Sequence, residues 1–140
     1  MGKRHKAREL ALKCVYAFDS VGEDADKVCA NMIATAELND EGRDFAEALF
    51  RKVAATLPEL DAQIEKHSKN WDIDRLAMVD KNILRLAICE LLFFPDIPAR
   101  IVINEGVELA KRFSTSDSSR FVNGLLDAVY HESSATQNES

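Results

Sequence analysis

The stretch ILRLAICELL, residues 83–92, places apolar side chains in pairs that recur every three to four residues. Two further strings follow it, IPARIVINEGVELAKRF at residues 97–113 and FVNGLLD at residues 121–127, and both keep this spacing. Side chains three and four residues apart share one face of an α-helix, whereas a strand would alternate. The strings therefore predict three consecutive helices, and the first, with the broadest apolar face, is expected to be the central helix of the fold. Asn104, Glu105 and Asn123 stand beside the apolar stripes without an obvious surface role.

The joins between these helices carry residues that stop and start helices. Pro95 and Pro98 separate the first two, because proline lacks an amide N–H and restricts the residue before it. Thr115 and Ser116 precede the third helix, whose free amides their hydroxyls can cap. Gly124 lies inside that helix, where glycine costs about 1 kcal/mol relative to alanine. We expect a neighbouring helix to approach closely there, with a merely tolerated glycine as the alternative.

The same spacing continues toward the amino terminus and predicts seven helices in all. The first two helices are expected at about residues 4–19 and 25–37. Asn39 and Asp40 offer caps for the third, and Pro58 can start the fourth. The core positions predicted for the second helix are Val28, Met32 and Ala36, and those for the sixth are Val102, Ile103, Val107, Ala110 and Phe113. No strand alternation persists, so we predict an all-α single domain at residues 1–132 and a disordered polar tail at residues 133–140.

Composition narrows the class of protein. A chain of 140 residues with 46% hydrophobic and 30% charged residues has enough apolar surface for one globular core. Its apolar runs are far shorter than the roughly 20 residues that cross a membrane. The basic amino terminus is not followed by the apolar segment of a signal peptide, so a cytoplasmic location is expected.

Charge is distributed unevenly. Residues 1–13 contain five cations against Glu9, a net charge of +4, and because the whole chain carries −6 the other 127 residues carry −10. At physiological salt, charges further apart than the screening length of about 8 Å hardly influence one another. The amino terminus can therefore contact a polyanion although the chain is acidic. Single-stranded RNA is bound by cations along its phosphates and by aromatic platforms, and Tyr16 is expected on the helix face of Lys6 and Lys13. The alternative is a basic start that only solubilises the chain.

Catalytic and metal sites are not indicated. The three cysteines (Cys14, Cys29 and Cys89) are widely separated and form no CxxC pair, so we expect them in the core. His67 falls on an apolar stripe and is expected to be a hydrogen-bonded boundary residue. Glu105 and Glu108 lie one turn apart, but helix-start contacts for Glu105 and pairing of Glu108 with Lys111 or Arg112 explain them better than acid–base chemistry. No nucleophile-elbow, zinc-protease, dinucleotide or P-loop motif is present, so we predict neither an enzyme nor a cofactor.

The order of the three strings, with aspartate and proline at the first join and a Ser/Thr run at the second, resembles the NusB family of transcription antitermination factors. The resemblance extends to the amino terminus and covers nearly the whole chain. It implies two packed helical sub-bundles with one core, and a function in binding the boxA element of nascent ribosomal RNA. In the family an arginine-rich amino-terminal segment contributes to this binding. Here that segment is GKRHKAR, residues 2–8, in which lysine replaces some of the arginine and lacks its planar fork.

The resemblance also implies site residues and partners. The expected RNA-binding residues are Lys3, Arg4, Lys6, Arg8 and Lys13 in the first helix and Asp117, Arg120 and Phe121 at the start of the last. The residues expected to face NusE, a ribosomal protein of the small subunit, are Tyr16, Asp74, Asp80 and Arg85. Core packing is the alternative for Phe121, helix-start capping for Asp74 and Asp80, and an intramolecular ion pair for Arg85.

The sequence therefore predicts an RNA-binding adaptor that acts with NusE in an antitermination complex on RNA polymerase, without a membrane or a cofactor. An all-helical protein-interaction module without specific RNA binding is the alternative. Whether the free chain forms a homodimer is left open by the sequence.

Overall fold

The computed structural model describes residues 2–68 and 76–139, with side chains described for residues 4–68 and 76–134. Within these residues every regular element is helical, as predicted. The chain divides into two compact units, Met1–Thr56 and Leu57–Ser140. None of the described helices is both long enough and apolar enough to span a bilayer.

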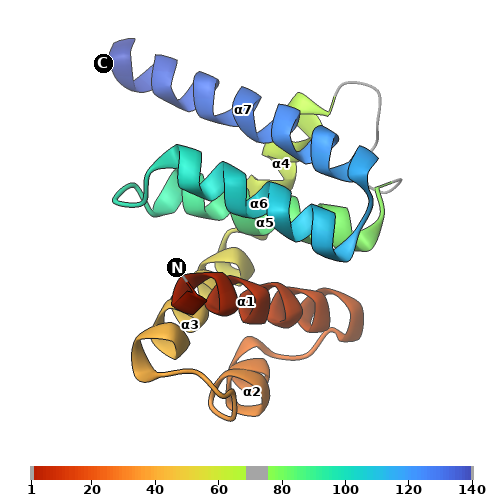
Figure 1. The fold of residues 1–140 in the computed structure, drawn as a ribbon, viewed down its shortest axis with the longest axis vertical. Coiled ribbons are helices and arrows are strands. Elements are labelled where there is room, and N and C mark those ends of the chain that lie inside the picture. The colour runs from red at the N-terminus through yellow and green to blue at the C-terminus, as the bar shows by residue number, and fades with distance from the viewer. Residues whose placement is uncertain (1, 69–75, 140) are drawn as a thin grey trace. The chain divides into compact units, whose positions relative to one another are not determined.

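The first unit contains α1 (Gly2–Val21), α2 (Ala25–Val28), a π-helical turn (Cys29–Ile33) and α3 (Asp40–Ala55). Helix α1 lies along α3 (Figure 1) and buries Ala7, Ala11 and Cys14. Phe18 meets Phe50 of α3 edge to face, with ring centroids 5.8 Å apart. Helix α1 ends at Gly22, whose φ of 75° is accessible to glycine at little steric cost.

The second predicted helix is shorter than expected and has a different register. Residues 25–37 were predicted to form one helix with Met32 and Ala36 inward, but the helix ends at Ile33 and the two side chains are only half-buried. The amide of Ala34 donates to the carbonyl oxygen of Cys29 at 3.0 Å, a bond across five residues. The π-helical turn widens the helix and turns Cys29 and Ile33 into the core instead.

The second unit contains α4 (Leu57–His67), α5 (Met78–Phe93), α6 (Ala99–Phe113) and α7 (Ser116–Glu139). Helix α6 lies against both α5 and α7 (Figure 1), and α4 contacts α5 and α7. Helix α5 is buried at Asp80 and throughout residues 82–90, which confirms the broad apolar face predicted for it. Prolines mark the join as predicted, since α5 ends before Pro95 and Pro98 immediately precedes α6.

Of the glycines in α6 and α7, Gly106 is closely packed and Gly124 is not. A Cβ atom at Gly124 would meet nothing within 4 Å, so the prediction of a close helix approach there is wrong. A Cβ atom at Gly106 of α6 would lie 3.0 Å from Leu126 Cδ1 and 3.4 Å from Ala87 Cβ. The absence of a side chain at Gly106 therefore lets α6 approach both α5 and α7.

Two further expectations for this unit differ from the structure. Phe113, predicted to be in the core, is 38% exposed, because it ends α6 where its neighbours turn away into the join. Gly106 and Leu109 are buried on α6, and Val107 is only half-buried. Helix α7 extends over Ser116–Glu139.

Candidate nucleic-acid interface

The cations of α1 occupy two faces of the helix. Arg4 and Arg8 are four residues apart and lie over the same ring, that of Phe45 in α3, with guanidinium carbons 4.6 and 5.4 Å from its centroid. Arg4 remains exposed, whereas Arg8 is only 3% exposed. Arg8, predicted to bind RNA, is therefore not brought to the surface with the other cations. An arginine over an aromatic face gains about 0.5–1 kcal/mol at an exposed site, so Phe45 orders Arg4.

A second face of α1 presents lysines to solvent. Lys6 and Lys13 are exposed and lie seven residues, about two helical turns, apart. Tyr16 follows Lys13 by three residues and is 48% exposed, as predicted. Glu9, the one acidic residue within residues 4–13, lies 2.9 Å from His5 on the same helix. We call Lys6, Lys13 and Tyr16 the lysine face; the side chain of Lys3 lies outside the described residues.

The start of α7 forms a separate exposed strip. Asp117 and Arg120 have side chains 91% and 80% exposed, and their charged atoms are 3.9 Å apart. Phe121, next to Arg120, is half-buried, which fits a core-edge position as well as a contact residue. Thr115 caps the helix as predicted, because its Oγ1 accepts a hydrogen bond from the amide of Ser118 at 3.0 Å. The strip is therefore presented by a well-anchored helix start.

The residues expected to face NusE lie in different environments. Tyr16 is exposed, but Asp80 and Arg85 are buried, and Asp74 lies outside the described residues. Arg85 donates to both oxygens of Asp61, with Nε–Oδ1 2.7 Å and Nη2–Oδ2 2.8 Å. The intramolecular ion pair kept open for Arg85 is thus present.

Asp80 does not cap α5, whose first residues have no side-chain cap. Its Oδ2 instead accepts a hydrogen bond of 2.8 Å from the Ser118 hydroxyl of α7. That hydroxyl also lies 3.0 Å from the side-chain oxygens of Ser114 and Thr115. The Ser/Thr run after α6 is therefore a hydrogen-bonded joint between α5 and α7, which sequence spacing did not reveal.

The candidate catalytic groups are engaged in structural contacts. Glu108 pairs with Lys111 at 3.6 Å, as expected. His67 is 13% exposed and its Nε2 lies 3.0 Å from Glu132 Oε2. Hydrogen bonding from Lys66, at 2.6 Å, lowers the pKa of Glu132. Within residues 2–68 and 76–139, no three His, Cys, Asp or Glu side chains gather where they could hold a metal ion.

The cysteines are free thiols in the core, as predicted. Cys14, Cys29 and Cys89 are all buried. Burial raises the pKa of Cys14 to about 12. Burial also raises the pKa of Cys29; Arg51 opposes this shift, and Glu47 and Asp26 add to it. All three are therefore packing residues, and the raised pKa values keep Cys14 and Cys29 in the neutral thiol form at ordinary pH.

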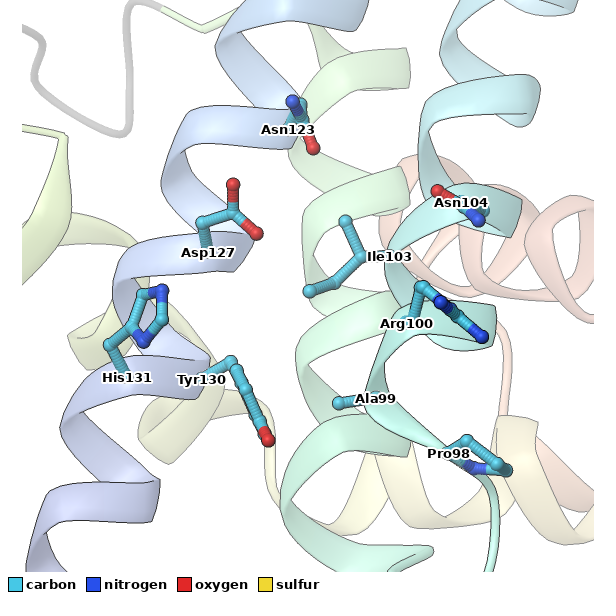
Figure 2. A pocket seen from close by; sticks show the side chains of 9 residues that line it. All are labelled: Pro98, Ala99, Arg100, Ile103, Asn104, Asn123, Asp127, Tyr130 and His131. Atoms are coloured by element: carbon cyan, nitrogen blue, oxygen red, sulfur yellow. The ribbon is translucent and has the colours of Figure 1, made fainter.

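One surface feature was only hinted at by the sequence. A groove runs between α6 and α7, with a volume of about 630 Å³. Figure 2 shows Arg100 and Asn104 on the α6 side, Asn123 and Asp127 on the α7 side, and Ile103 between the two helices. The two asparagines were noticeable in the sequence as polar residues beside apolar stripes, but their position on facing helices requires the tertiary structure.

Fold and site together define an all-α protein that presents cations and an aromatic side chain from helix surfaces. The family model for the NusB family matches residues 5–131. The chain therefore belongs to the NusB family.

Known proteins resemble this chain over most of its length. It is 46% identical to the transcription antitermination protein NusB of Natranaerobius thermophilus over 132 residues, covering 92% of this chain and 95% of that protein. It is 42% identical to the protein of the same name in Chloroherpeton thalassium, again over 92% of this chain, but it spans only 62% of that longer relative. A crystal structure of antitermination factors NusB and NusE in complex with double-stranded RNA contains a chain with a TM-score of 0.85 and 31% identity, covering 94% of this chain and 98% of that one. The relatives are named for a non-enzymatic role.

Proposed function

We propose that this protein is a cytoplasmic transcription antitermination factor that binds boxA-like RNA of nascent ribosomal transcripts together with NusE, in a complex on RNA polymerase. The observation that carries the proposal is the lysine face of α1, where two exposed cations and an exposed aromatic side chain share one helix surface. Resemblance to a NusB chain solved with NusE and double-stranded RNA supports the same assignment.

The lysine face suits a single strand. Lys6 and Lys13 are about 10 Å apart along the helix axis, seven steps of about 1.5 Å, which matches the reach of a strand over one or two phosphates. Lysine ammonium groups neutralise phosphates as point charges, and Tyr16 offers a ring on which a base can stack. Arg4 adds a planar guanidinium that Phe45 already holds in place, so less side-chain freedom is lost on binding.

The α7 strip contributes a second contact in the proposal. Arg120 is the cation that meets phosphate, and Phe121 supplies the edge of an aromatic ring. Asp117 opposes the same phosphate, because its carboxylate is exposed on the same turn. In this strip Arg120 therefore raises the affinity for RNA and Asp117 lowers it.

The proposed NusE contact lies near Tyr16, Asp80 and Arg85, of which Asp80 and Arg85 are themselves buried. Most of the chain carries a net charge of −10, which attracts a basic ribosomal protein and speeds encounter. Asp80 and Arg85 support this contact indirectly, by holding neighbouring helices on α5. Asp80 is bonded to Ser118 of α7 and Arg85 to Asp61 of α4. Among the described members of this set, Tyr16 is exposed and can touch a partner directly.

Fluorescence anisotropy of a labelled boxA RNA tests the proposal. The protein should bind boxA more tightly than a scrambled RNA of equal length, and NusE should increase that difference. Neutralising about four phosphates gives a slope near −3 for log affinity against log salt, and Lys6→Ala should make the slope shallower. Equal affinity for both RNAs, with or without NusE, would reject antitermination and favour a protein-interaction module. Lys27→Ala, at an exposed lysine outside the lysine face, is the matched control.

A further inference from the structure

The groove between α6 and α7 is lined by polar side chains that bond to no other described residue. Arg100, Asn104 and Asn123 are exposed and Asp127 is half-buried. Within the described residues, no hydrogen bond or ion pair engages any of these four side chains. Some other charged groups of this unit are paired, among them Arg85 with Asp61 and Lys66 with Glu132. The groove therefore gathers four polar side chains that have no hydrogen-bond or ion-pair partner among the described residues.

The walls of the groove come from facing helices. Arg100 and Asn104 are one turn apart on α6, and Asn123 and Asp127 are one turn apart on α7. Figure 2 shows the Asp127 carboxylate directed toward the space between the helices, with Ile103 beside it in that space. Tyr130, 40% exposed, lies at the same end as Pro98 and Ala99 and adds an apolar wall. Each helix thus supplies one carboxamide and one charge, around an apolar floor.

This lining selects among ligand classes by its charge. A phosphodiester strand would meet one cation and one anion, so it gains no net Coulomb attraction from the groove. An extended peptide presents alternating N–H and C=O groups, and a carboxamide offers one acceptor and two donors that can bond both. Asp127 would favour a basic side chain and Arg100 an acidic one, with an apolar side chain between them over Ile103. A volume of about 630 Å³ lies within the usual range for binding pockets.

We propose that the α6–α7 groove is a docking site for an extended segment of a partner protein, one that carries a basic, an apolar and an acidic side chain in close succession. Asn104 and Asn123 hold the peptide backbone, and Asp127 and Arg100 set its direction. None of the groove residues is among the proposed RNA-binding residues, so the groove adds a second contact through which this adaptor joins an assembly.

Nuclear magnetic resonance tests this with defined probes. The ¹⁵N-labelled protein is titrated with the capped pentapeptides acetyl-KVLVE-amide and acetyl-EVLVK-amide, with the uncharged acetyl-SVLVS-amide, and with hexaadenylate RNA. One of the two charged peptides should produce saturable shifts of amide signals around Asn104 and Asn123. We expect it to bind at least fivefold more tightly than the uncharged peptide and than the peptide of reversed order.

Variants tie the shifts to the groove. The double variant Asn104→Ala and Asn123→Ala should weaken the charged peptide at least fivefold, and Asn31→Ala, an exposed asparagine of the other unit, should leave it unchanged. Asp127→Asn keeps the side-chain volume and should weaken the charged peptide while leaving the uncharged one unaffected. Affinity for boxA RNA should not change in any of these variants, so failure of the RNA proposal would be seen separately. The peptide assignment is overturned by the absence of saturable shifts, by equal binding of the uncharged peptide, or by tighter binding of hexaadenylate at the same signals.

Discussion

Arg85 of the central helix and Asp61 of α4 form a two-point ion pair, in which Nε and Nη2 of the guanidinium donate to the two carboxylate oxygens at 2.7 and 2.8 Å. The Arg85 side chain is 6% exposed and that of Asp61 is 27% exposed. Arg85 Nη1 also donates to Asn82 Oδ1 at 3.0 Å, so the pair belongs to a small buried network.

Removal of Asp61 should destabilise the second unit strongly. Breaking a buried ion pair costs about 3–5 kcal/mol, because the remaining charge stays buried without its partner. Because the Asp61 side chain is partly exposed to solvent, we expect Asp61→Asn to lower the free energy of unfolding by about 3 kcal/mol, the low end of that range. Urea denaturation followed by circular dichroism measures it. Asp96→Asn, at an exposed aspartate, should change stability by less than about 0.5 kcal/mol; equal effects of the two variants would show that the pair contributes nothing.

The same substitution at two glycines should have opposite effects. Gly124→Ala adds a methyl group into open space and should stabilise α7 by up to about 1 kcal/mol through helix propensity. Gly106→Ala forces its Cβ against Leu126, which is fully buried and cannot move aside freely. Overpacking typically costs about 1–3 kcal/mol, which outweighs the propensity gain. Thermal unfolding of both variants compares them, and a stabilised Gly106→Ala would contradict the close helix approach.

Phe45 should act on RNA affinity through Arg4. Phe45→Leu keeps an apolar side chain but removes the ring over which the Arg4 guanidinium lies. An exposed cation–π contact contributes about 0.5–1 kcal/mol, so boxA affinity should fall about threefold. Anisotropy measures the loss, and Phe45→Tyr should restore binding. Phe18→Leu in the same unit is the control, since its ring meets Phe50 and not an arginine; a similar loss there would point to general loosening of the unit.

Asp117 should weaken RNA binding in the native protein. Asp117→Asn removes an exposed negative charge next to Arg120 without changing side-chain size, and should tighten boxA binding about threefold, since one exposed charge contributes up to about 1 kcal/mol. Arg120→Gln should weaken binding. Anisotropy at low salt gives both values, with Asp96→Asn as control. Unchanged affinity in both α7 variants would place this strip away from the RNA.

Alkaline pH should destabilise the first unit through Cys14. Burial raises the pKa of this thiol from 9.0 to about 12 in the folded protein. Below pH 9 both folded and unfolded states hold the proton, and stability is unaffected; between pH 9 and 12 the unfolded state loses it first, so stability falls as pH rises. Urea midpoints at pH 8 and pH 10 should differ more for the native protein than for Cys14→Ala. The same pH dependence in both proteins would assign the loss to other groups.

Helix content and most boundaries could be predicted because they depend on neighbours along the chain. The steps of three and four residues, Pro95 and Pro98, Asn39 and Thr115 all act within one or two turns. The π-helical turn at Cys29–Ile33 could not be predicted in this way, since the inserted residue shifts the register without changing the composition.

The candidate site was predictable as a set of residue types but not as a surface. Lys6, Lys13 and Tyr16 were placed correctly because one helix determines its own faces. Arg8 is buried beside Phe45, a residue of another helix, so its burial depends on a contact across 37 positions of sequence. Asp80 was expected at a surface and instead accepts a hydrogen bond from Ser118, again across helices.

The amino-acid sequence by itself determined the all-α class, the family, the concentration of positive charge in the first 13 residues and the apolar face of the central helix, because these are properties of periodicity and composition. Tertiary structure alone decided which glycine permits close packing, which arginines remain at the surface, and that Asn104 and Asn123 line one groove. The physical reason is that burial and pairing depend on the side chains of a second helix, and helical spacing carries no information about which helix that is.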